Sequence, residues 1–571
     1  MQHTSRNVLR ACGAALVCSS FAVSRPALAD YPIASHRYLA DPGSLVSGGR
    51  VYLYASNDDD NPVEGGYQMK SIVCVSSSDL KNWTDHGEVL RVPANAAWAN
   101  DSWAPAAIER NESVYLYFGN NAGGIGVASS TSPLGPFADP IGAALVSFGT
   151  PGASGTNMWL FDPSVFIDDD GQAYLSFGGN ADNNARIIPL NSDMVSVAGA
   201  AVALTLPDFF EASWLHKQEG LYYLSYSTTA ATGQRIDYMT SSSPTSGFTY
   251  RGIVGGQPPT NNNNNHHSIF EFEGSWYHAY HNRLVSTEAA IPTTYRRNLA
   301  LEPLAYNTDG TIQQVTYTTD GVPQLGRLNP YLRVEAETTN AQRGIETEPC
   351  SEGGMNVTDI QGGDWLELRG VDFGSTGAVS FSARVASATS GGAIELRLDG
   401  PDGTLVGTCT VPGTGGPQAW ASSSCPVSGA TGVHDLYLTF TGVGSPLFNV
   451  DYWQFATDGV DAGGVGGAVG NGNAGVSGLF GVGGQGDSVG GEVIGADGAV
   501  GVAGSPAGDP ETVTARSALR DAEGCNCVVA ARRERSPASP MAIFIVAWVA
   551  LRARRRHIGA QRPRATRRSA K

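Results

Sequence analysis

The sequence predicts an all-β protein in which a five-bladed β-propeller is followed by a β-sandwich. Three observations support this fold class. Short stretches of alternating apolar and polar residues, separated by turns rich in Gly, Asn, Asp and Pro, fill the region up to about residue 319, and almost no run there has helical periodicity. One strand–turn–strand pattern occurs five times within this region. A second group of strands, from about residue 334 to residue 455, has the length of one sandwich domain.

The repeated unit is a β-hairpin that begins with a residue of functional type. In each copy this residue is followed by a short apolar run, a polar or Gly-containing turn and an aromatic strand. The copies start roughly 50 to 60 positions apart, which allows about four short strands per copy and favours the blades of a propeller. Because the first strand of each blade lines the central axis, five starting residues are expected to converge on one pocket: Asp41, Trp103, Asp162, Glu211 and His267.

The start of the chain has the pattern of an export signal. Residues 1–29 contain Arg6 and Arg10 ahead of an apolar run over 14–23, and they end in the small-residue sequence Ala-Leu-Ala at 27–29, which is typical of a signal-peptidase site. We therefore expect a signal peptide over 1–29 and Asp30 at the mature N-terminus. The whole chain has 571 residues and a formal net charge of −17, a balance that gives no sign of nucleic-acid binding.

The remaining domain boundaries follow from changes in composition. The propeller is expected over 30–325 and the sandwich over 330–456. Cys409 and Cys425 fall in the sandwich, where a disulfide would close about 16 residues and stabilise the fold by on the order of 3 kcal/mol. Cys74 and Cys350 are left unassigned, and buried free thiols are at least an equal alternative for them.

Beyond the sandwich the chain no longer predicts a folded domain. Residues 457–520 are dominated by Gly, Ala, Val and Ser, the composition of a flexible linker. The tail, 521–571, contains Cys525 and Cys527, an apolar run over 541–551 and a cluster of arginines. Eleven apolar residues are too few for a stable membrane span, which needs about 17 to 25. This order resembles the C-terminal sorting tails of myxobacterial surface proteins, and the alternative is a disordered basic tail.

Three carboxylates in one pocket predict hydrolytic chemistry. Two acids are the minimum for cleaving a glycosidic bond, since one protonates the leaving oxygen while the other activates water or attacks. Asp41, Asp162 and Glu211 exceed that minimum, and like-charge repulsion would keep one of them protonated near neutral pH. Phe209 and Phe210 beside Glu211 would raise its pKa by desolvation, as a general acid requires.

The other candidates allow more than one interpretation. Asp41 and Asp162 each precede a proline, which fixes the local backbone but is equally common at ordinary strand starts. His267 could bind substrate, hold a metal-bound water at the propeller axis or be a hydrogen-bonded core histidine. The acids at 168–170 are expected to form a turn.

Long stretches of the chain carry a family resemblance. The matching segments are RYLADPGSLVSGGRVYLYASNDDDNP, FDPSVFIDDDGQAYLSFGGN, FFEASWLHKQ, NNNNHHSIFEFEGSWYHAYHNR and RVEAETTNAQRGIETEPC. From His36 to about Phe455 the sequence resembles glycoside hydrolase family 43 followed by a family-6 carbohydrate-binding module, in particular the arabinoxylan arabinofuranohydrolases of that family. The resemblance implies a five-bladed propeller and an inverting mechanism.

The resemblance also implies roles for individual residues of the pocket. Asp41 resembles the general base, Glu211 the general acid and Asp162 the carboxylate that tunes pKa and orients the sugar. An inverting site is expected to hold the base and acid carboxyls about 6.5 to 9.5 Å apart. His267 resembles an axial histidine near a bound cation, and Arg283 an arginine below the sugar. The remaining substrate-binding residues are expected in the pocket walls: Trp103, Trp159 and Phe210.

In the sandwich the resemblance implies a calcium site and a sugar-binding cleft. Glu335, Glu337 and Asp451 resemble the calcium ligands, and oxygen ligands suit that ion. Trp420 and Asn449 fall where the module family has a sugar-stacking aromatic residue and a hydrogen-bonding amide; a core tryptophan is the alternative for Trp420. A second aromatic residue of the cleft is not identifiable.

Together these observations predict an exported, monomeric, inverting α-L-arabinofuranosidase that acts on arabinoxylan without a catalytic cofactor. The sandwich would hold xylan, and the tail would keep the enzyme at the cell surface or allow its secretion. One alternative is a β-xylosidase or arabinan-cleaving enzyme on the same fold. Another is a surface-held carbohydrate-binding protein that has lost activity.

Overall fold

The computed structural model describes residues 32–457, apart from 63–65, 181–182, 230–233, 262 and 292. The predicted signal peptide, almost all of the linker and the tail with Cys525 and Cys527 lie outside the described residues. In the described part of the chain, no helix is long and apolar enough to cross a membrane.

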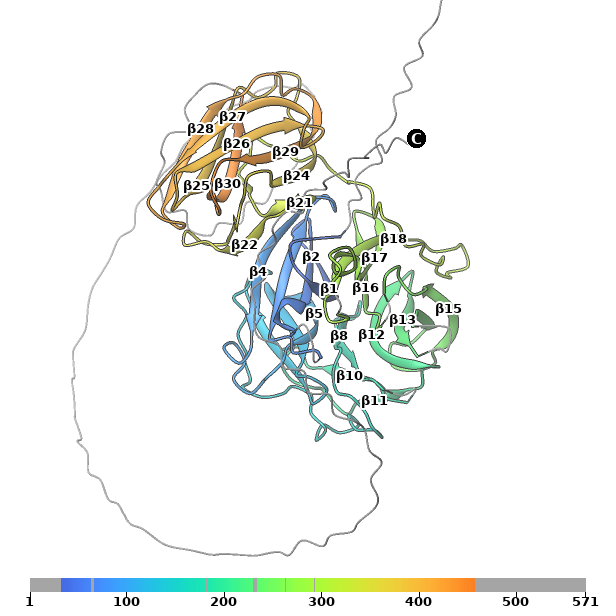
Figure 1. The fold of residues 1–571 in the computed structure, drawn as a ribbon. Coiled ribbons are helices and arrows are strands. Elements are labelled where there is room, and N and C mark those ends of the chain that lie inside the picture. The colour runs from blue at the N-terminus through green and yellow to red at the C-terminus, as the bar shows by residue number, and fades with distance from the viewer. Residues whose placement is uncertain are drawn as a thin grey trace, which may run out of the picture. The chain divides into compact units, whose positions relative to one another are not determined.

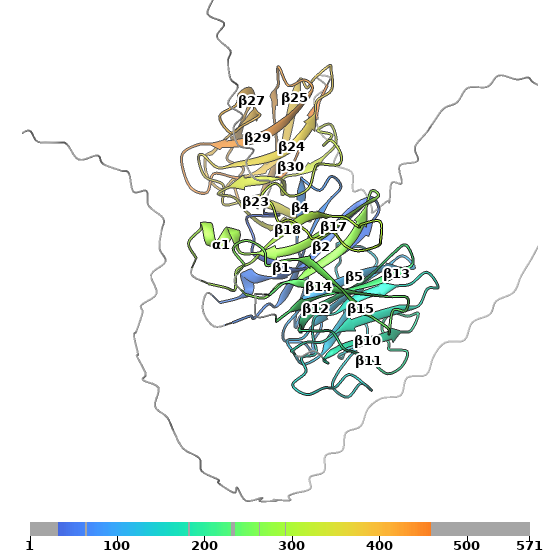
Figure 2. The ribbon, with the colours of Figure 1, turned by 90° about the vertical axis from the view of Figure 1, so that its right-hand side faces the viewer.

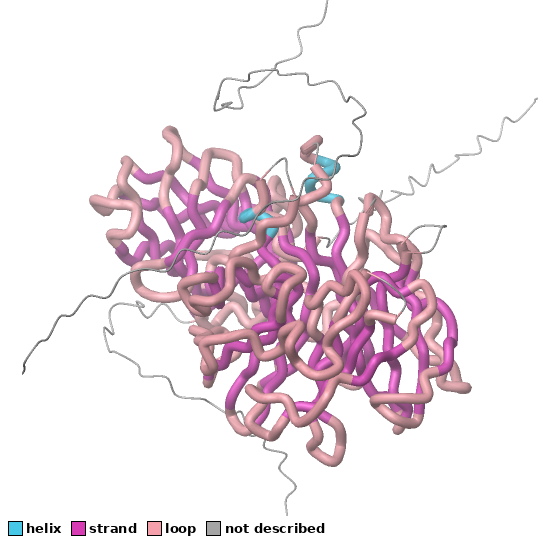
Figure 3. The backbone as a smooth tube through the Cα atoms, turned by 90° about the horizontal axis from the view of Figure 1, so that it is seen from below, coloured by secondary structure: helices cyan, strands magenta, loops and turns pink. Residues whose placement is uncertain are grey.

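Strands form nearly all of the regular structure in this range, as the fold class predicts (Figure 3). The exceptions among the described residues are the short 3-10 helix η1 (Asp58–Asp60) and the helix α1 (Leu284–Glu288). The strands form five consecutive antiparallel sheets, here called sheets I to V, and then two further sheets.

Each of sheets I to V is built from strands that follow one another along the chain. Sheet I contains β1 (Leu39–Ser47), β2 (Arg50–Asn57), β3 (Ser71–Ser77) and β4 (Trp83–Arg91), extended by β20 (Thr338–Thr339). Sheet II contains β5 (Trp103–Arg110), β6 (Ser113–Gly119) and β7 (Ile125–Ser130). Sheet III contains β8 (Ser164–Ile167), β9 (Ala173–Phe177), β10 (Ala185–Leu190) and β11 (Val202–Leu204). Sheet IV contains β12 (Phe209–Gln218), β13 (Leu221–Thr228), β14 (Ile236–Ser241) and β15 (Thr249–Gly255). Sheet V contains β16 (His267–Phe272), β17 (Ser275–Asn282) and β18 (Asn298–Leu304).

The first strands of the five sheets close a ring. Strand β1 contacts β5, β5 contacts β8, β8 contacts β12, β12 contacts β16, and β16 contacts β1. Figure 1 shows these strands gathered in the middle of the five sheets, and β1, β5 and β12 again lie together in Figure 2. Ile33 forms a β-bridge with Leu299 of β18, so the start of the described chain joins the last sheet. The fivefold repeat predicts this convergence.

Apolar residues fill the spaces between neighbouring sheets. One cluster includes Ile125 of β7, Leu175 of β9 and Tyr223 of β13, all fully or almost fully buried. The close approach of β1 to β5 in the ring also requires a glycine. A Cβ at Gly43 in β1 would lie 2.0 Å from the carbonyl oxygen of Pro105 in β5, so no larger residue fits there without movement of the backbone.

The second domain is a β-sandwich, as predicted. One sheet has the order β22-β23-β30-β25-β28 with β19 paired to β30, and the other has the order β21-β24-β29-β26-β27. The strands of the first sheet are β19 (Val334–Glu335), β22 (Glu346–Pro349), β23 (Met355–Thr358), β25 (Ser380–Ala386), β28 (Trp420–Pro426) and β30 (Asn449–Ala456). Those of the second are β21 (Ala341–Arg343), β24 (Trp365–Asp372), β26 (Gly391–Leu398), β27 (Thr404–Pro412) and β29 (Val433–Thr441).

A disulfide joins the two sheets of the sandwich. Cys409 in β27 and Cys425 in β28 are bonded, with their Cα atoms 5.0 Å apart. The bond closes the loop that the sequence spacing suggested. Cys74 and Cys350 are free and buried, which agrees with the alternative of buried thiols.

Candidate active site

A cavity of about 390 Å³ lies in the ring of five sheets. Its lining includes the three acids singled out in the sequence, Asp41, Asp162 and Glu211, which the fold brings together from sheet I, the start of sheet III and sheet IV. Their neighbours in the wall are mostly aromatic or amide side chains. The full lining is Asp41, Tyr67, Met69, Trp103, Asn121, Ala122, Trp159, Phe161, Asp162, Phe210, Glu211, Asn263, Asn264, His266 and Arg297.

Irregular backbone at the strand starts positions the acids. Asp41 has φ 54° and lies where the pairing of β1 with β2 shifts register. Glu211 lies between two register shifts in the pairing of β12 with β13, and Ala212 after it has φ 57°. Asp162 has φ 50°. Left-handed backbone is costly for residues other than glycine and is concentrated at functional sites, where a bulge re-aims a side chain.

Arg297 is the cationic partner of Asp41. Its Nη1 donates to Asp41 Oδ1 over 2.6 Å, while Nε and Nη2 each bond Asp58 over 2.8 Å. All three side chains are buried. Burial alone would raise the pKa of Asp41, but the guanidinium of Arg297 outweighs it and holds the pKa well below the usual value. Asp41 is therefore ionised at any working pH.

Glu211 has the opposite electrostatic environment. Burial and the negative charge of Asp41 raise its pKa to about 8, although a hydrogen bond with Asn264 and the charge of Arg297 act against this shift. One of its carboxyl oxygens, Oε1, is buried without a hydrogen-bond partner. At neutral pH Glu211 consequently carries a proton that it can donate.

Asp162 lies beside both other acids. Burial and the charges of Glu211 and Asp41 raise its pKa well above the usual value. Its Oδ2 accepts the backbone N–H of Ala212 over 3.1 Å, which connects it to the residue that follows Glu211. His266 Nδ1 lies 3.7 Å from Oδ1 of Asp41 and 3.7 Å from Oδ2 of Asp162. Burial lowers the pKa of His266 to about 4, so its imidazole is neutral between the two acids.

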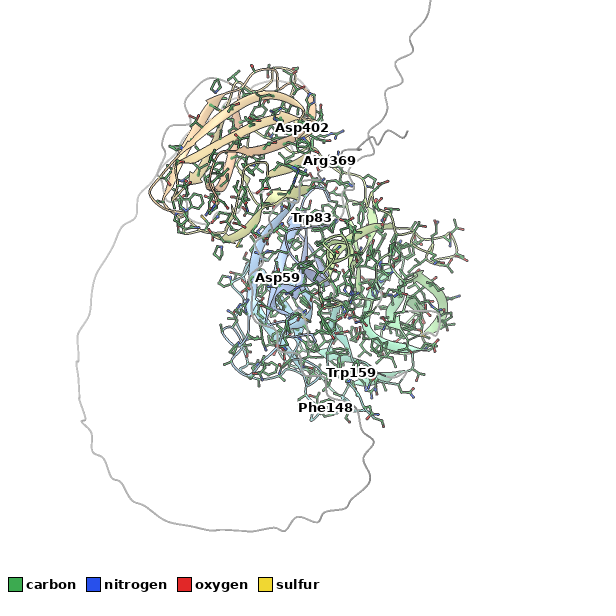
Figure 4. All side chains as sticks on the ribbon, in the orientation of Figure 1. Asp59, Trp83, Phe148, Trp159, Arg369 and Asp402 are labelled. Atoms are coloured by element: carbon green, nitrogen blue, oxygen red, sulfur yellow. A yellow bond between two sulfur atoms is a disulfide. The ribbon has the colours of Figure 1, made fainter. Side chains whose placement is uncertain are left out.

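Aromatic rings form the walls of the cavity. Trp159, labelled in Figure 4, packs edge-on against Phe161 and Phe210 at centroid distances of 5.4 and 5.7 Å. On the sheet II side, Trp103 packs against Tyr67 at 6.4 Å. Flat apolar faces with a few charged groups at the base are suited to a sugar ring. Trp103, Trp159 and Phe210, expected in the pocket walls, all line the cavity.

His267 and Arg283 do not line the cavity. His267 is fully buried, and its Nε2 lies 2.6 Å from Ser225 Oγ. Arg283 is almost fully buried; it donates to Thr294 O over 2.8 Å and to Asn264 Oδ1 over 3.1 Å. It thus lies behind Asn264 rather than below the cavity, where Arg297 is found. The structure provides no support for direct sugar contacts from either residue.

The cavity residues that the sequence analysis did not identify include three that contact or neighbour the acids: Arg297, His266 and Asn264. His266 directly precedes His267, and a one-residue displacement at a strand start turns a side chain to the other face. Asn264 belongs to an asparagine run with no internal landmark. Arg297 has no local signal, because its partner Asp41 is 256 positions away.

The sandwich residues form two groups. Trp420 is half-buried, and its Nε1 donates to Ser351 Oγ over 3.0 Å. The amide of Asn449 is used internally: Nδ2 donates to Glu348 Oε1 over 2.8 Å and to Pro417 O over 2.9 Å, and Oδ1 accepts from Thr358. The amide of Asn449 is therefore hydrogen-bonded within the sandwich.

The second group consists of the three carboxylates expected to bind calcium. Glu337 Oε2 and Asp451 Oδ1 are buried without a hydrogen-bond partner. Burial and the charge of Glu335 raise the pKa of Asp451 to about 6, against the opposing charge of Arg333. Burial and the charges of Glu335 and Asp451 also raise the pKa of Glu337. Glu335 itself is paired with Arg333 over 2.8 Å. Buried oxygens without hydrogen-bond partners suit a hard cation, although the described residues contain no cluster of three or more Asp, Glu, His or Cys side chains in a metal-binding arrangement.

The cavity can perform acid/base chemistry. An ionised carboxylate and a protonated carboxyl in one largely apolar cavity are the two groups that hydrolysis of an acetal needs. The difference in their protonation has a structural cause, because Arg297 contacts Asp41 directly.

Comparison with known proteins gives independent information. Residues 29–312 match Glycosyl hydrolases family 43, and residues 335–457 match Carbohydrate binding module (family 6). The chain is 43% identical over 472 residues to an arabinoxylan arabinofuranohydrolase of Bacillus subtilis (strain 168), covering 74% of this chain and 92% of that relative. It is 42% identical over 470 residues to an arabinoxylan arabinofuranohydrolase of Paenibacillus polymyxa, covering 74% of each. A crystal structure of a family 43 arabinoxylan arabinofuranohydrolase from Bacillus subtilis in complex with cellotetraose superposes with a TM-score of 0.70 at 44% identity, covering 75% of this chain and 97% of that one.

Proposed function

The chain belongs to family 43 of the glycosyl hydrolases and is a glycosidase, and we propose that it releases α-L-arabinofuranosyl side groups from arabinoxylan with inversion at the anomeric carbon. The opposite protonation of Asp41 and Glu211 in one cavity is the observation that carries this proposal. On this proposal the ring of five sheets is a five-bladed propeller with its site at the axis.

The reaction proceeds in one displacement. Asp41, ionised by its contact with Arg297, takes a proton from a water molecule as the water oxygen bonds to the anomeric carbon. Glu211 gives its proton to the leaving oxygen of the xylose unit as the glycosidic bond breaks. The products are free arabinose and a xylan chain that lacks this side group, with Glu211 ionised and Asp41 protonated. Proton exchange with solvent restores both groups.

Asp162 has a supporting role in this mechanism. Burial and the charges of Glu211 and Asp41 raise its pKa well above the usual value, which favours the protonated form. A protonated carboxyl can also donate a hydrogen bond to a sugar hydroxyl. The proposal therefore assigns Asp162 to sugar orientation; the tuning of the pKa of Glu211 that the family resemblance implies would need the ionised form of Asp162.

The sandwich is a carbohydrate-binding module of family 6, and we propose that it holds xylan and binds calcium. Trp420 would supply the stacking face of the sugar cleft. Glu337, Asp451 and Glu335 would hold the ion, and the two buried oxygens without hydrogen-bond partners support this choice. The ion would stabilise the module and would take no part in hydrolysis. A cation near His267 is a separate proposal: Nε2 of this residue lies against Ser225 Oγ, and its Nδ1 is buried without a hydrogen-bond partner.

Export and surface retention remain proposals that rest on the sequence patterns at 1–29 and 521–571. We propose that the enzyme acts outside the cell as a monomer. Polymeric arabinoxylan is too large for uptake, which agrees with an extracellular location.

The products released from three substrates test the function. The full-length enzyme is incubated with arabinoxylan, xylo-oligosaccharides and linear arabinan, and the sugars are separated by chromatography. Arabinose from arabinoxylan is the expected main product. Xylose would identify a β-xylosidase, arabino-oligosaccharides an arabinan-cleaving enzyme, and tight xylan binding without release an inactive carbohydrate-binding protein.

A further inference from the structure

Three residues at the ring share one unusual backbone arrangement. Asp41, Ala104 and Ala212 all have φ between 45° and 57°, and each lies at a register shift near the start of a first strand. In each case the backbone N–H is bonded by a side chain instead of the strand ladder. The acceptor comes from the preceding sheet of the ring each time: Ser56 Oγ for Ala104 (2.8 Å), Asp162 Oδ2 for Ala212 (3.1 Å) and His281 Nδ1 for Asp41 (3.2 Å).

These contacts compensate for the bulges. Left-handed backbone is unfavourable for residues other than glycine. A buried backbone N–H that does not bond a neighbouring strand needs another acceptor. At Ala104 the compensation is purely structural. At Asp41 the same contact fixes the residue that activates water in the proposed function.

The hydrogen bonds of His281 define its protonation. Its Nε2 lies 3.0 Å from the backbone oxygen of Asn264, which can only accept, so Nε2 carries the hydrogen. Its Nδ1 is then the lone-pair nitrogen that accepts the N–H of Asp41 over 3.2 Å, and the same nitrogen lies 3.3 Å from Asp41 Oδ1. The side chain is fully buried, and burial lowers its pKa, which keeps the ring neutral in this tautomer.

His281 therefore connects the two halves of the site. One ring nitrogen bonds the backbone of Asp41, and the other bonds the backbone of Asn264, whose side chain bonds Glu211. His281 does not line the cavity, so it has no direct contact with substrate there.

We propose that His281 is a positioning residue that holds Asp41 in its left-handed conformation through the Nδ1 contact, so that the carboxylate is aimed at the attacking water. This inference rests on the proposed function. The proposal assigns the effect of His281 on Asp41 to Nδ1 alone. Substitutions can therefore distinguish this contact from a general role of the ring in packing.

Two substitutions separate the nitrogens. In His281→Asn the side-chain oxygen replaces Nδ1 and can still accept the N–H of Asp41, whereas the contact with Asn264 is lost. In His281→Gln the amide reaches the position of Nε2 and keeps the contact with Asn264, whereas Asp41 loses its acceptor. His278→Asn is the matched control: this histidine lies on the same strand, β17, is fully buried, and is not among the residues that line the cavity.

The measurement is kcat and KM for hydrolysis of 4-nitrophenyl α-L-arabinofuranoside by the full-length variants, with Tm as the check of folding. We expect His281→Gln to lower kcat by about 100-fold, the usual cost of displacing a catalytic group by about 1 Å. His281→Asn should retain kcat within about threefold, and His278→Asn should match the wild type. Equal losses in the Asn and Gln variants, or wild-type kcat in the Gln variant, would overturn the proposal. A wild-type enzyme inactive on this substrate and on arabinoxylan would instead refute the proposed function.

A spectroscopic measurement tests the tautomer of His281 in the wild type itself. ¹⁵N-labelled histidine is introduced, and the signal of His281 is identified by its loss in His281→Asn. We expect the shifts of a neutral ring protonated at Nε2 across pH 5 to 8. A ring protonated at Nδ1 could not accept the N–H of Asp41, and that result would exclude the proposed contact.

Discussion

Arg297 Nη1 lies 2.6 Å from Asp41 Oδ1, and both side chains are buried in the ring. The same guanidinium bonds Asp58 through two further nitrogens, so one arginine compensates two buried carboxylates. This contact gives Asp41 and Glu211 different protonation states although both are acids in a single cavity.

Removing the charge of Arg297 should abolish the difference between the two acids. In Arg297→Met the pKa of Asp41 is expected to rise, because burial is no longer opposed. We expect kcat/KM to fall by about 10² to 10⁴, the usual contribution of a general base, and a new acidic limb to emerge in the pH profile. Arg297→Lys keeps a charge and should lose less activity. A pH profile of Arg297→Met with the wild-type shape would contradict this role.

A substitution at Asp58 separates the effect of Arg297→Met on stability from its effect on activity. Arg297→Met leaves Asp58 buried without its partner, which costs on the order of 3 to 5 kcal/mol. The double variant Asp58→Asn/Arg297→Met removes the unpaired charge. Urea denaturation should show recovery of much of the lost free energy of unfolding, while kcat stays low because Asp41 still lacks a cation. Recovery of activity together with stability would show that Arg297 acts only through folding.

Activity should be lost at alkaline pH. Glu211 has a pKa raised to about 8 and donates its proton in the reaction, so only its protonated form is active. We expect kcat/KM to be level between about pH 6 and 7 and to fall tenfold per pH unit well above 8. Asp41 stays ionised throughout this range and adds no limb. A decline that begins near pH 5 would show that Glu211 titrates normally and is not the acid.

A substitution at Asn264 tests whether Glu211 causes the fall of kcat/KM at alkaline pH. The hydrogen bond of Asn264 stabilises ionised Glu211 and so lowers the pKa of this acid. Asn264→Ala should therefore move the alkaline limb to higher pH, whatever it does to kcat. An unchanged or lowered midpoint in the kcat/KM profile would contradict the contact.

The leaving group should distinguish the acid from the base. Glu211→Gln cannot protonate the departing oxygen, a loss that matters most for a poor leaving group such as a xylose hydroxyl. We expect a fall of about 10² to 10⁴ in kcat/KM on arabinoxylan and a much smaller one on an aryl arabinofuranoside with an acidic phenol. Asp41→Asn should lose activity on both substrates to a similar extent. Equal losses of Glu211→Gln on the two substrates would argue against its role as proton donor.

The residues that sequence alone located are those with a local signal. Asp41, Asp162 and Glu211 each stand at the start of a repeated hairpin, and alternation along a strand is determined by nearest neighbours. The repeat also predicted the closed ring and hence the convergence of these acids.

The residues that were missed depend on contacts distant in sequence. Arg283 follows β17 and Arg297 precedes β18, and no local feature shows which of the two reaches the cavity. The choice between His266 and His267 depends on where β16 begins, and strand and helix ends are uncertain by one or two residues. In both cases a different residue of the same type lines the cavity, His266 in place of His267 and Arg297 in place of Arg283.

Gly43 should be intolerant of a side chain. A Cβ there would lie 2.0 Å from the backbone oxygen of Pro105, so Gly43→Ala must displace β1, which carries Asp41, from β5. We expect a loss of about 1 to 3 kcal/mol in the free energy of unfolding together with a fall in kcat. Gly256→Ala, where a Cβ meets nothing within 4 Å, is the matched control and should change neither. Similar denaturation midpoints for the two variants would show that the ring yields easily at Gly43.

Calcium should stabilise the sandwich without affecting hydrolysis. An ion bound to Glu337, Asp451 and Glu335 at 100 times its Kd contributes about 2.7 kcal/mol, and its removal should lower the Tm of a domain of this size by roughly 10 °C. EDTA should therefore shift the unfolding transition of the wild type and leave kcat on a small aryl arabinofuranoside unchanged. In Asp451→Asn the Tm should already be low and insensitive to EDTA, whereas Asp402→Asn, which alters an exposed acid of the same domain (Figure 4), should behave as the wild type. A Tm of the wild type that is the same with calcium and with EDTA would refute the site, because two buried carboxylate oxygens without hydrogen-bond partners would then have to be stable without a cation.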